Sequence, residues 1–199
     1  MMGANLTKLF CVDIESTCWN TPEEQGTKPN EVIEIGLCVL KLGRTPEQTI
    51  ITEKRSYPVK PQFSEVSEFC TSLTGWTQGE IDKAPSITEV LSQIQSDYKM
   101  STNNIWASYG EYDRVKLSSD VGQNGGLYDL YSITRLSNPF SYMRAHYNVK
   151  TLMAFKERLS REIGMARALA FYGLELEGRH HNGADDAFNI AKILARVLS

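Results

Sequence analysis

The fold of this chain is most constrained by an apolar run that leads directly into two acidic residues. Leu9 to Val12 (LFCV) is typical of a buried strand, and Asp13 and Glu15 follow it with Ile14 between them. Because side chains alternate across a strand, this spacing places both carboxylates on one face and turns Ile14 toward the core. Two carboxylates on one face repel each other unless a cation lies between them. The pattern predicts either a cation site or an acidic strand end exposed to water.

Three further segments have the composition of strands, and with the first they predict a central sheet. They are Val32 to Leu40, Ile50 to Val59 and Asn104 to Tyr109. Between the first two strands, the segment Thr21 to Asn30 is rich in Pro, Gly, Glu and Lys, which predicts a loop.

Helical signals occupy the middle and the last third of the chain. Ser86 and Glu89 have the spacing of a capping box, and the apolar residues that follow share one helical face. Gly173 is placed to end one of the later helices. The expected helices cover Ile87 to Tyr98, a start at Glu111 to Leu117, Thr151 to Leu159, Arg161 to Tyr172 and Ala184 to Leu198. This order predicts an α/β fold, a central mixed β-sheet flanked by α-helices, in a single domain over residues 1–199.

Length and composition are those of one globular domain. The chain has 199 residues, of which 41% are hydrophobic and 23% charged, enough for a sizeable core. No apolar run approaches the roughly 18 to 20 residues that a membrane span needs, and the first residues do not resemble a signal peptide. The cysteines have neither Cys-x-x-Cys spacing nor a nearby histidine, which argues against zinc; they are Cys11, Cys18, Cys38 and Cys70. We therefore expect an intracellular, cytoplasmic protein with free thiols, those of Cys11 and Cys38 being buried.

The net charge narrows the ways in which the chain could bind a nucleic acid. A formal charge of −3 argues against binding through a broad basic surface. It leaves open an enzyme whose acidic pocket holds substrate phosphates through bound cations.

Three more chemically active side chains stand at predicted element boundaries. Asp113 follows the strand that ends at Tyr109, and His181 and Asp186 stand five residues apart where the last helix begins. Each alone has an ordinary explanation, such as an acid in the first turn of a helix or a surface histidine. Together, four carboxylates could converge on one pocket, as two-metal phosphoryl-transfer chemistry requires. Carboxylate oxygens favour Mg²⁺ or Mn²⁺.

Several strings in this order resemble those of the DEDDh 3′→5′ exonucleases, and most of all the Eri-type RNA exonucleases. That group includes the histone-mRNA 3′ exonuclease and a bacterial inhibitor of a sporulation-kinase pathway. The strings are FCVDIESTCWN (10–20), NEVIEIGLCVL (30–40), SEFCTSLTGWTQGEID (67–82), ASYGEYDR (107–114) and EGRHHNGADDAFNIAKI (177–193). The resemblance implies a ribonuclease H-like fold and the removal of 5′-mononucleotides from the 3′ end of single-stranded RNA.

The resemblance also implies roles for the five residues. Asp13, Glu15 and Asp186 correspond to ligands of a first divalent cation, and Asp13 with Asp113 to ligands of a second. His181, rather than His180, corresponds to the catalytic histidine, which acts as a general base toward the attacking water. A neutral imidazole suits that role.

A substrate pocket follows from the same resemblance. One wall would consist of Ser16, Thr17 and Trp19, and the opposite wall of Leu73, Thr74 and Trp76. Either tryptophan could stack on a base, because aromatic faces accept any base. Either could equally be a core residue.

Three alternatives remain at this stage. The substrate could be DNA, although the string STCW favours RNA, since a contact to the 2′-hydroxyl made by the backbone leaves no trace in a sequence. The chain could be a catalytically silent regulatory protein with the same fold, although none of the five residues is missing. A ribonuclease H-type endonuclease has a similar acidic cluster, but the placement of the histidine and the LTGW string favours recognition of a chain end.

Overall fold

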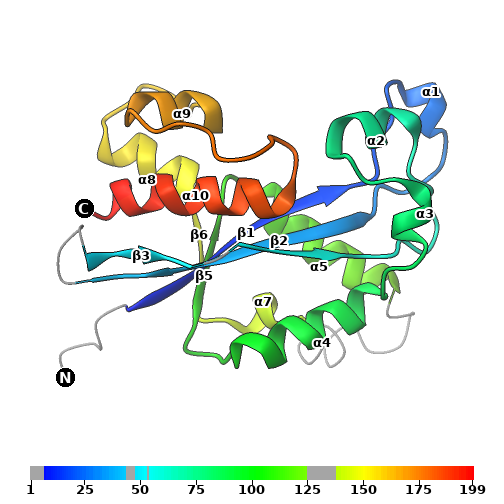
Figure 1. Cartoon of the computed structure of the whole chain (residues 1–199), viewed down its shortest axis with the longest axis horizontal. Coiled ribbons are helices and arrows are strands. Elements are labelled where there is room, and N and C mark those ends of the chain that lie inside the picture. Colours follow the sequence, from blue (N-terminus) through cyan, green and yellow to red (C-terminus); the bar gives the residue numbers. More distant parts are fainter. Residues whose placement is uncertain (1–6, 44–47, 53, 125–137) are drawn as a thin grey trace.

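The computed structural model describes residues 7–43, 48–52, 54–124 and 138–199. Within these ranges six strands form one mixed sheet, with helices on both faces (Figure 1). The strands are β1 (Lys8–Ser16), β2 (Val32–Lys41), β3 (Ile50–Ile51), β4 (Arg55–Pro58), β5 (Ile105–Ser108) and β6 (Ala145–Asn148). The predicted mixed sheet flanked by helices is confirmed. The expectation that the first residues are not a signal peptide concerns residues 1–6, which lie outside the described part of the chain.

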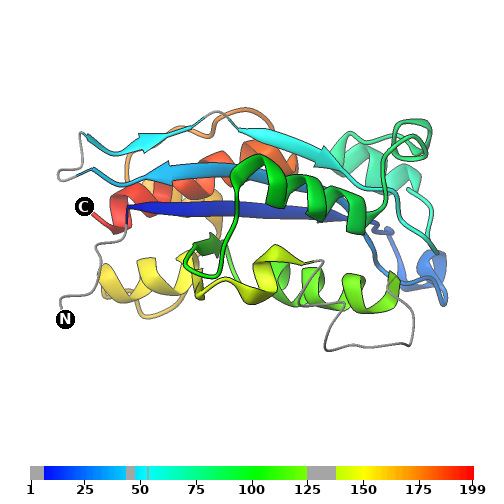
Figure 2. The ribbon, with the colours of Figure 1, turned by 90° about the horizontal axis from the view of Figure 1, so that it is seen from below.

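Strand β1 lies at the centre of the sheet. It pairs antiparallel with β2 and parallel with β5, and β6 continues the parallel part beyond β5. Strands β3 and β4 both pair antiparallel with β2 on its other edge (Figure 2). The central position gives β1 neighbours on both sides, so its direction and register are held along its length.

Helices cover the two faces of the sheet, and three short ones lie near the end where β1 finishes (Figure 1). One face carries α8 (Val149–Lys156), α9 (Met165–Phe171) and α10 (Gly183–Val197). The other carries α4 (Ile87–Tyr98), α5 (Tyr112–Asn124) and α7 (Pro139–Tyr142). The short helices are α1 (Pro22–Gln25), α2 (Glu68–Thr74) and α3 (Gln78–Ile81). No helix in the described ranges combines the length and apolar character needed to cross a bilayer.

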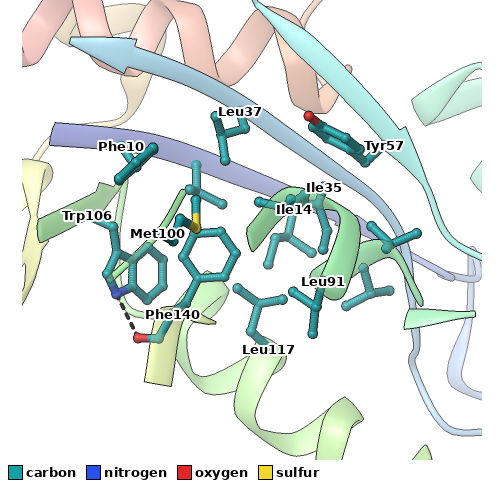
Figure 3. Close-up of a cluster of buried hydrophobic side chains, with 14 of the residues drawn as sticks. Phe10, Ile14, Ile35, Leu37, Tyr57, Leu91, Met100, Trp106, Leu117 and Phe140 are labelled. Atoms are coloured by element: carbon teal, nitrogen blue, oxygen red, sulfur yellow. Dashed lines mark hydrogen bonds between the residues drawn. The ribbon is translucent and has the colours of Figure 1, made fainter. Parts of the chain in front are cut away.

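Side-chain alternation along β1 divides the core into two layers. Phe10, Val12 and Ile14 point toward α4 and α5, where they join Leu91 and Trp106 in one buried cluster (Figure 3). The indole nitrogen of Trp106 donates a hydrogen bond to the carbonyl oxygen of Phe140, 3.1 Å away. This pairing allows a large amphipathic ring to lie in an otherwise apolar layer.

The opposite face of β1 and β2 is apolar at one end and acidic at the other. Leu9 and Cys11 pack under α10 with Cys38 and Leu40, and the expected buried free thiols are confirmed. The same alternation continues the β1 row into Asp13 and Glu15. Ile14 is buried on the other side, as its position between the two acids predicted.

Several elements differ from the sequence prediction. The single strand expected at Ile50 to Val59 is wrong, because β3 and β4 pair with different parts of β2. Between them the hydroxyl of Thr52 accepts the Val39 N–H, a bond that a regular ladder would give to a backbone carbonyl; residue 53 lies outside the described ranges. The expected loop at Thr21 to Asn30 contains α1, whose N-terminus is capped by the Thr21 side chain.

The later helices are close to the prediction, with one late start. Helix α9 begins at Met165 rather than Arg161, with Gly164 as its N-cap. Gly173 follows this helix in a left-handed conformation (φ +65°), as expected of a glycine that ends a helix. Strand β6 and helices α2, α3 and α7 were not predicted from the sequence. Strand β6 is four residues long and largely polar, and only its ladder with β5 identifies it as a strand.

The first turn of α10 comes unusually close to β2 at two glycines. A Cβ atom at Gly36 would overlap the carbonyl group of Gly183, and one at Gly183 would lie 3.0 Å from the Gly36 nitrogen. Both obstacles are backbone atoms, which cannot move aside as a flexible side chain could. The pair therefore sets how near α10 can lie to the acidic end of the sheet.

We expect Gly36→Ala to destabilise the fold by at least about 2 kcal/mol, because an added methyl group would force the helix and the sheet apart. Gly79→Ala is the matched control, since a Cβ there meets no atom within 4 Å. It should leave stability within about 1 kcal/mol of the parent chain. Urea unfolding followed by circular dichroism measures both variants, and equal midpoints would contradict the importance of this close approach.

Candidate active site

Three carboxylates come together at the end of the sheet where α10 begins. Carboxylate oxygens of Asp13, Glu15 and Asp186 all lie within 4.8 Å of one another. Asp13 and Glu15 come from β1, and Asp186 comes from the first turn of α10. Glu15 is 8% exposed and Asp186 2%, whereas Asp13 is partly exposed. The predicted convergence of these three residues is present in the structure.

The fourth predicted carboxylate, Asp113, contacts the backbone of β1 next to this cluster. It lies in the first turn of α5 and is 5% exposed. Its Oδ1 accepts a hydrogen bond from the backbone N–H of Ile14, 3.1 Å away, which holds it against the strand between the two acids. Asp113 therefore lies beside the cluster, although it is not one of the three carboxylates whose oxygens all lie within 4.8 Å of one another.

Burial and mutual repulsion raise the pKa values of this cluster. Burial raises the pKa of Asp13 well above its usual range, and the charges of Asp113 and Glu15 add to the effect. Burial raises the pKa of Glu15 to about 8, followed by the effect of Glu34. Burial also raises the pKa of Asp113 to about 6, against the opposing effect of its hydrogen bonds. Bound cations would relieve this repulsion, and an all-oxygen donor set suits hard divalent ions.

Two neighbouring histidines precede α10, and they contact Asp186 through different atoms. The Nδ1 atom of His180 lies 3.0 Å from Asp186 Oδ2, and the backbone N–H of His181 donates to the same oxygen at 2.8 Å. The two rings stack with centroids 4.1 Å apart. His181 has a left-handed backbone (φ +63°), and burial, followed by the nearby His180, lowers its pKa. This shift favours the neutral imidazole of His181.

A network around Asp185 holds the histidine loop in place. Asp185 accepts the backbone N–H of Arg179 at 2.7 Å and forms an ion pair with Lys54. The guanidinium of Arg179 donates to the carbonyl oxygens of Ser72 and Leu73, at 2.7 and 3.0 Å. Asp185 is thus engaged by the loop, and Asp186 is the member of the acidic pair that faces the cluster.

A further carboxylate, the buried Glu34, lies beside the cluster and was not singled out from the sequence. It is opposite Glu15 in the β1–β2 register and is 0% exposed. A sequence signal was present, because Glu34 interrupts an otherwise apolar strand, VIEIGLCVL. A charged residue within such a run is rarely buried without a partner.

The residues predicted to form the substrate walls divide into two groups. Thr17 is 0% exposed, and its hydroxyl accepts the backbone N–H of Glu31. Thr74 is 3% exposed, and its hydroxyl donates to the Cys70 carbonyl and accepts the Trp76 N–H. These two threonine side chains are engaged in local structure, which a sequence motif does not reveal. The prediction that they contact substrate has no support from their side-chain positions.

The remaining residues of the predicted wall differ in how far their side chains are exposed. Ser16 is buried at the end of β1, directly after Glu15. Trp19, Leu73 and Trp76 are partly exposed. Trp19 lines a surface hollow with Phe69, and Trp76 packs partly against Ile33 and Cys70 while its indole nitrogen bonds to Glu34. Among the residues of the predicted wall, the side chains of Trp19, Leu73 and Trp76 therefore have exposed surface that a ligand could contact.

Known proteins similar to this chain are exonucleases. The chain is 28% identical to the 3′-5′ exonuclease eri1 of Schizosaccharomyces pombe over 98% of its own length and 69% of that protein. It is 31% identical to ERI1 exoribonuclease 2 of Danio rerio over 96% of its length, but it spans only 35% of that relative.

A solved structure with the same architecture is the nuclease domain of 3′hExo, described as a DEDDh family member bound to rAMP. The two share a TM-score of 0.78 and 23% identity, over 96% of this chain and 92% of that one. The likeness confirms the ribonuclease H-like fold expected from the sequence.

A family model supplies the assignment. The model described as exonuclease (RNase_T) matches residues 10–111, which include most of β1, all of β2 and β5, and two of the carboxylates, Asp13 and Glu15. With its acidic cluster at the end of the central strand, this chain belongs to the exonuclease (RNase_T) family.

Proposed function

We propose that the chain is a 3′→5′ exoribonuclease that hydrolyses terminal phosphodiesters of single-stranded RNA. The observation that carries the proposal is the convergence of Asp13, Glu15 and Asp186 within 4.8 Å, with Asp113 held beside them and His181 at the edge. A buried cluster of like charges lowers stability, so its presence favours a functional role.

The cluster fits two divalent cations, Mg²⁺ or Mn²⁺. Asp13, Glu15 and Asp186 would hold the first, and Asp13 with Asp113 the second. Burial and, for Asp13 and Glu15, neighbouring charges raise the pKa values of these carboxyl groups, so bound cations would stabilise their charged forms. When bound, such cations stabilise negative charge that develops on the phosphate and lower the pKa of water.

His181 would remove a proton from the attacking water. Burial lowers its pKa, so the imidazole is neutral and able to accept a proton at pH 7. The backbone bond from its N–H to Asp186 fixes the loop relative to the cluster. His180 instead directs its Nδ1 toward Asp186, which suits a role in orienting that carboxylate.

The choice of RNA rests on the relatives. The Danio rerio relative is named an exoribonuclease, and the 3′hExo nuclease domain was solved with a ribonucleotide. Partly exposed Trp19, Leu73 and Trp76 would line the position of the 3′-terminal nucleotide. Ser16, Thr17 and Thr74 would contribute through the backbone or by supporting this wall.

The first prediction from the proposed function concerns the substrate and the direction of cleavage. With Mg²⁺ or Mn²⁺, the chain should shorten a 5′-labelled single-stranded RNA in one-nucleotide steps from its 3′ end, and more slowly the DNA of the same sequence. Denaturing gels measure both rates, and chelation should abolish both. Faster cleavage of DNA would reject the RNA assignment, internal cuts would indicate an endonuclease, and intact oligonucleotides would favour a silent binding protein.

The second prediction separates the two histidines. His181→Ala should lower kcat by about 10²- to 10⁴-fold, the range expected for loss of a general base. His180→Ala is the matched comparison and should lower kcat by about tenfold, because it removes only a partner of Asp186. Asp13→Asn and Asp186→Asn should abolish turnover. A larger loss in His180→Ala than in His181→Ala would reverse the assignment of the base.

The third prediction concerns the stability of the chain without metal. The pKa of Glu15 is raised from 4.5 to about 8, so between these pH values the folded chain holds a proton that the unfolded chain has lost. Stability in a chelator should therefore fall as pH rises from 5 to 8, by up to about 1.4 kcal/mol per pH unit for each such group. Thermal unfolding at several pH values measures this slope.

Two controls accompany that measurement. Glu15→Gln lacks the titrating carboxyl group and should show a shallower decline. Mn²⁺ should raise the melting temperature more at pH 8 than at pH 5, because the ligands bind as carboxylates. A chain that becomes more stable from pH 5 to pH 8 in a chelator would contradict the prediction.

A further inference from the structure

Glu34 is the buried carboxylate closest in register to the acidic cluster, yet its surroundings differ from those of Glu15. It is 0% exposed and lies opposite Glu15 on the antiparallel β1–β2 pair. Both side chains therefore lie on the face of the sheet that α10 covers. The difference between them lies in their hydrogen-bond donors.

Four donors surround the Glu34 carboxylate. Its Oε2 accepts the indole N–H of Trp76 at 2.8 Å and the backbone N–H of Gly183 at 3.0 Å. Its Oε1 accepts the hydroxyl of Ser56 at 2.6 Å and, more weakly, the backbone N–H of Ala184 at 3.4 Å. With these bonds the carboxylate needs no cation, so it is not a further metal ligand of the cluster.

The donors come from three separate parts of the chain. Gly183 and Ala184 are the first residues of α10, where unpaired N–H groups and the helix dipole favour a negative charge. Trp76 follows α2, on the proposed substrate wall, and Ser56 belongs to β4. A single oxygen, Oε2, thus joins the substrate wall to the helix that carries Asp186.

Trp76 is held on its other side by apolar contacts. It packs against the cluster of Ile33, Val66, Cys70 and Ile81 and remains partly exposed. Apolar packing is not directional and by itself leaves the orientation of the ring free. The directional bond to Glu34 removes that freedom.

We propose that Glu34 is a positioning residue that orients the Trp76 ring relative to the first turn of α10. The ring then presents a fixed surface to the terminal nucleotide, at a set distance from His181 and Asp186. This inference rests on the proposed exonuclease function. It assigns Glu34 no contact with substrate or cation.

Matched variants test the role. Trp76→Phe keeps an aromatic ring but removes the donor to Oε2, and Ser56→Ala removes the donor to Oε1 on the side away from the wall. Glu34→Asp keeps the charge but withdraws the carboxylate by one methylene. We expect KM for 5′-labelled RNA to rise about tenfold in Trp76→Phe and Glu34→Asp, with kcat within about twofold. In Ser56→Ala both constants should stay within about twofold.

The double variant Glu34→Asp/Trp76→Phe separates coupling from independent effects. If Glu34 acts through Trp76, its KM should match that of Trp76→Phe alone. Hydrogen exchange of the indole protons gives a readout independent of turnover. Trp76 should exchange faster in Glu34→Asp, whereas Trp106, bonded to the Phe140 carbonyl, should be unchanged.

The outcomes distinguish this inference from the proposed function. An active parent chain in which Trp76→Phe and Ser56→Ala change KM equally, or in which the two effects add in the double variant, would overturn the positioning role and leave the exonuclease standing. Unchanged exchange at Trp76 in Glu34→Asp would overturn it as well, even if Trp76→Phe proved poorly folded. A parent chain without nuclease activity would overturn both.

Discussion

Helix α10 reaches the acidic end of β1 because two glycines meet where the helix begins over β2. With no side chain at Gly36 or Gly183, the backbone of the first helical turn lies directly on the strand. Asp186 then comes within 4.8 Å of Asp13 and Glu15, and Glu34 receives the first N–H groups of the helix. Both the candidate metal cluster and the hydrogen bonds of Glu34 to α10 depend on this close approach.

The site contains buried carboxylates in two electrostatic states. The carboxylate of Glu34 accepts four hydrogen bonds, two of them from the N-terminus of α10, so it links neighbouring elements of the structure. Asp13 and Glu15 are repelled by their neighbours, and burial raises their pKa values. The first arrangement is complete within the chain, whereas bound cations would relieve the repulsion in the second. On the same face of the sheet, Glu34 therefore has a structural role, whereas Asp13 and Glu15 belong to the candidate active site.

Much of the fold could be predicted from local patterns. The alternation around Ile14 and the capping box at Ser86 are short-range signals, and the strand and the helix that they predicted are present. Strand β6 and the division of Ile50 to Val59 into β3 and β4 were missed, because short polar strands are defined by the ladder that they join. Helix α2 was missed for a related reason, since only Cys70 and Thr74 of its seven residues are buried.

The sequence by itself determined which side chains could form the site: carboxylates at the end of one strand and in the first turns of two helices, with a histidine before the second. Residue type and spacing within one element are local properties, and they suffice for that. Only the tertiary structure decided that Thr17 and Thr74 are engaged in local bonds, that His180 contacts Asp186, and that Glu34 serves α10 and Trp76. The contacts of Glu34 join residues far apart in the chain, and the packing of α10 on β2 brings Gly183 to it. The contacts of Thr17, Thr74 and His180 span fewer residues, but residue type alone does not show which partner each side chain takes.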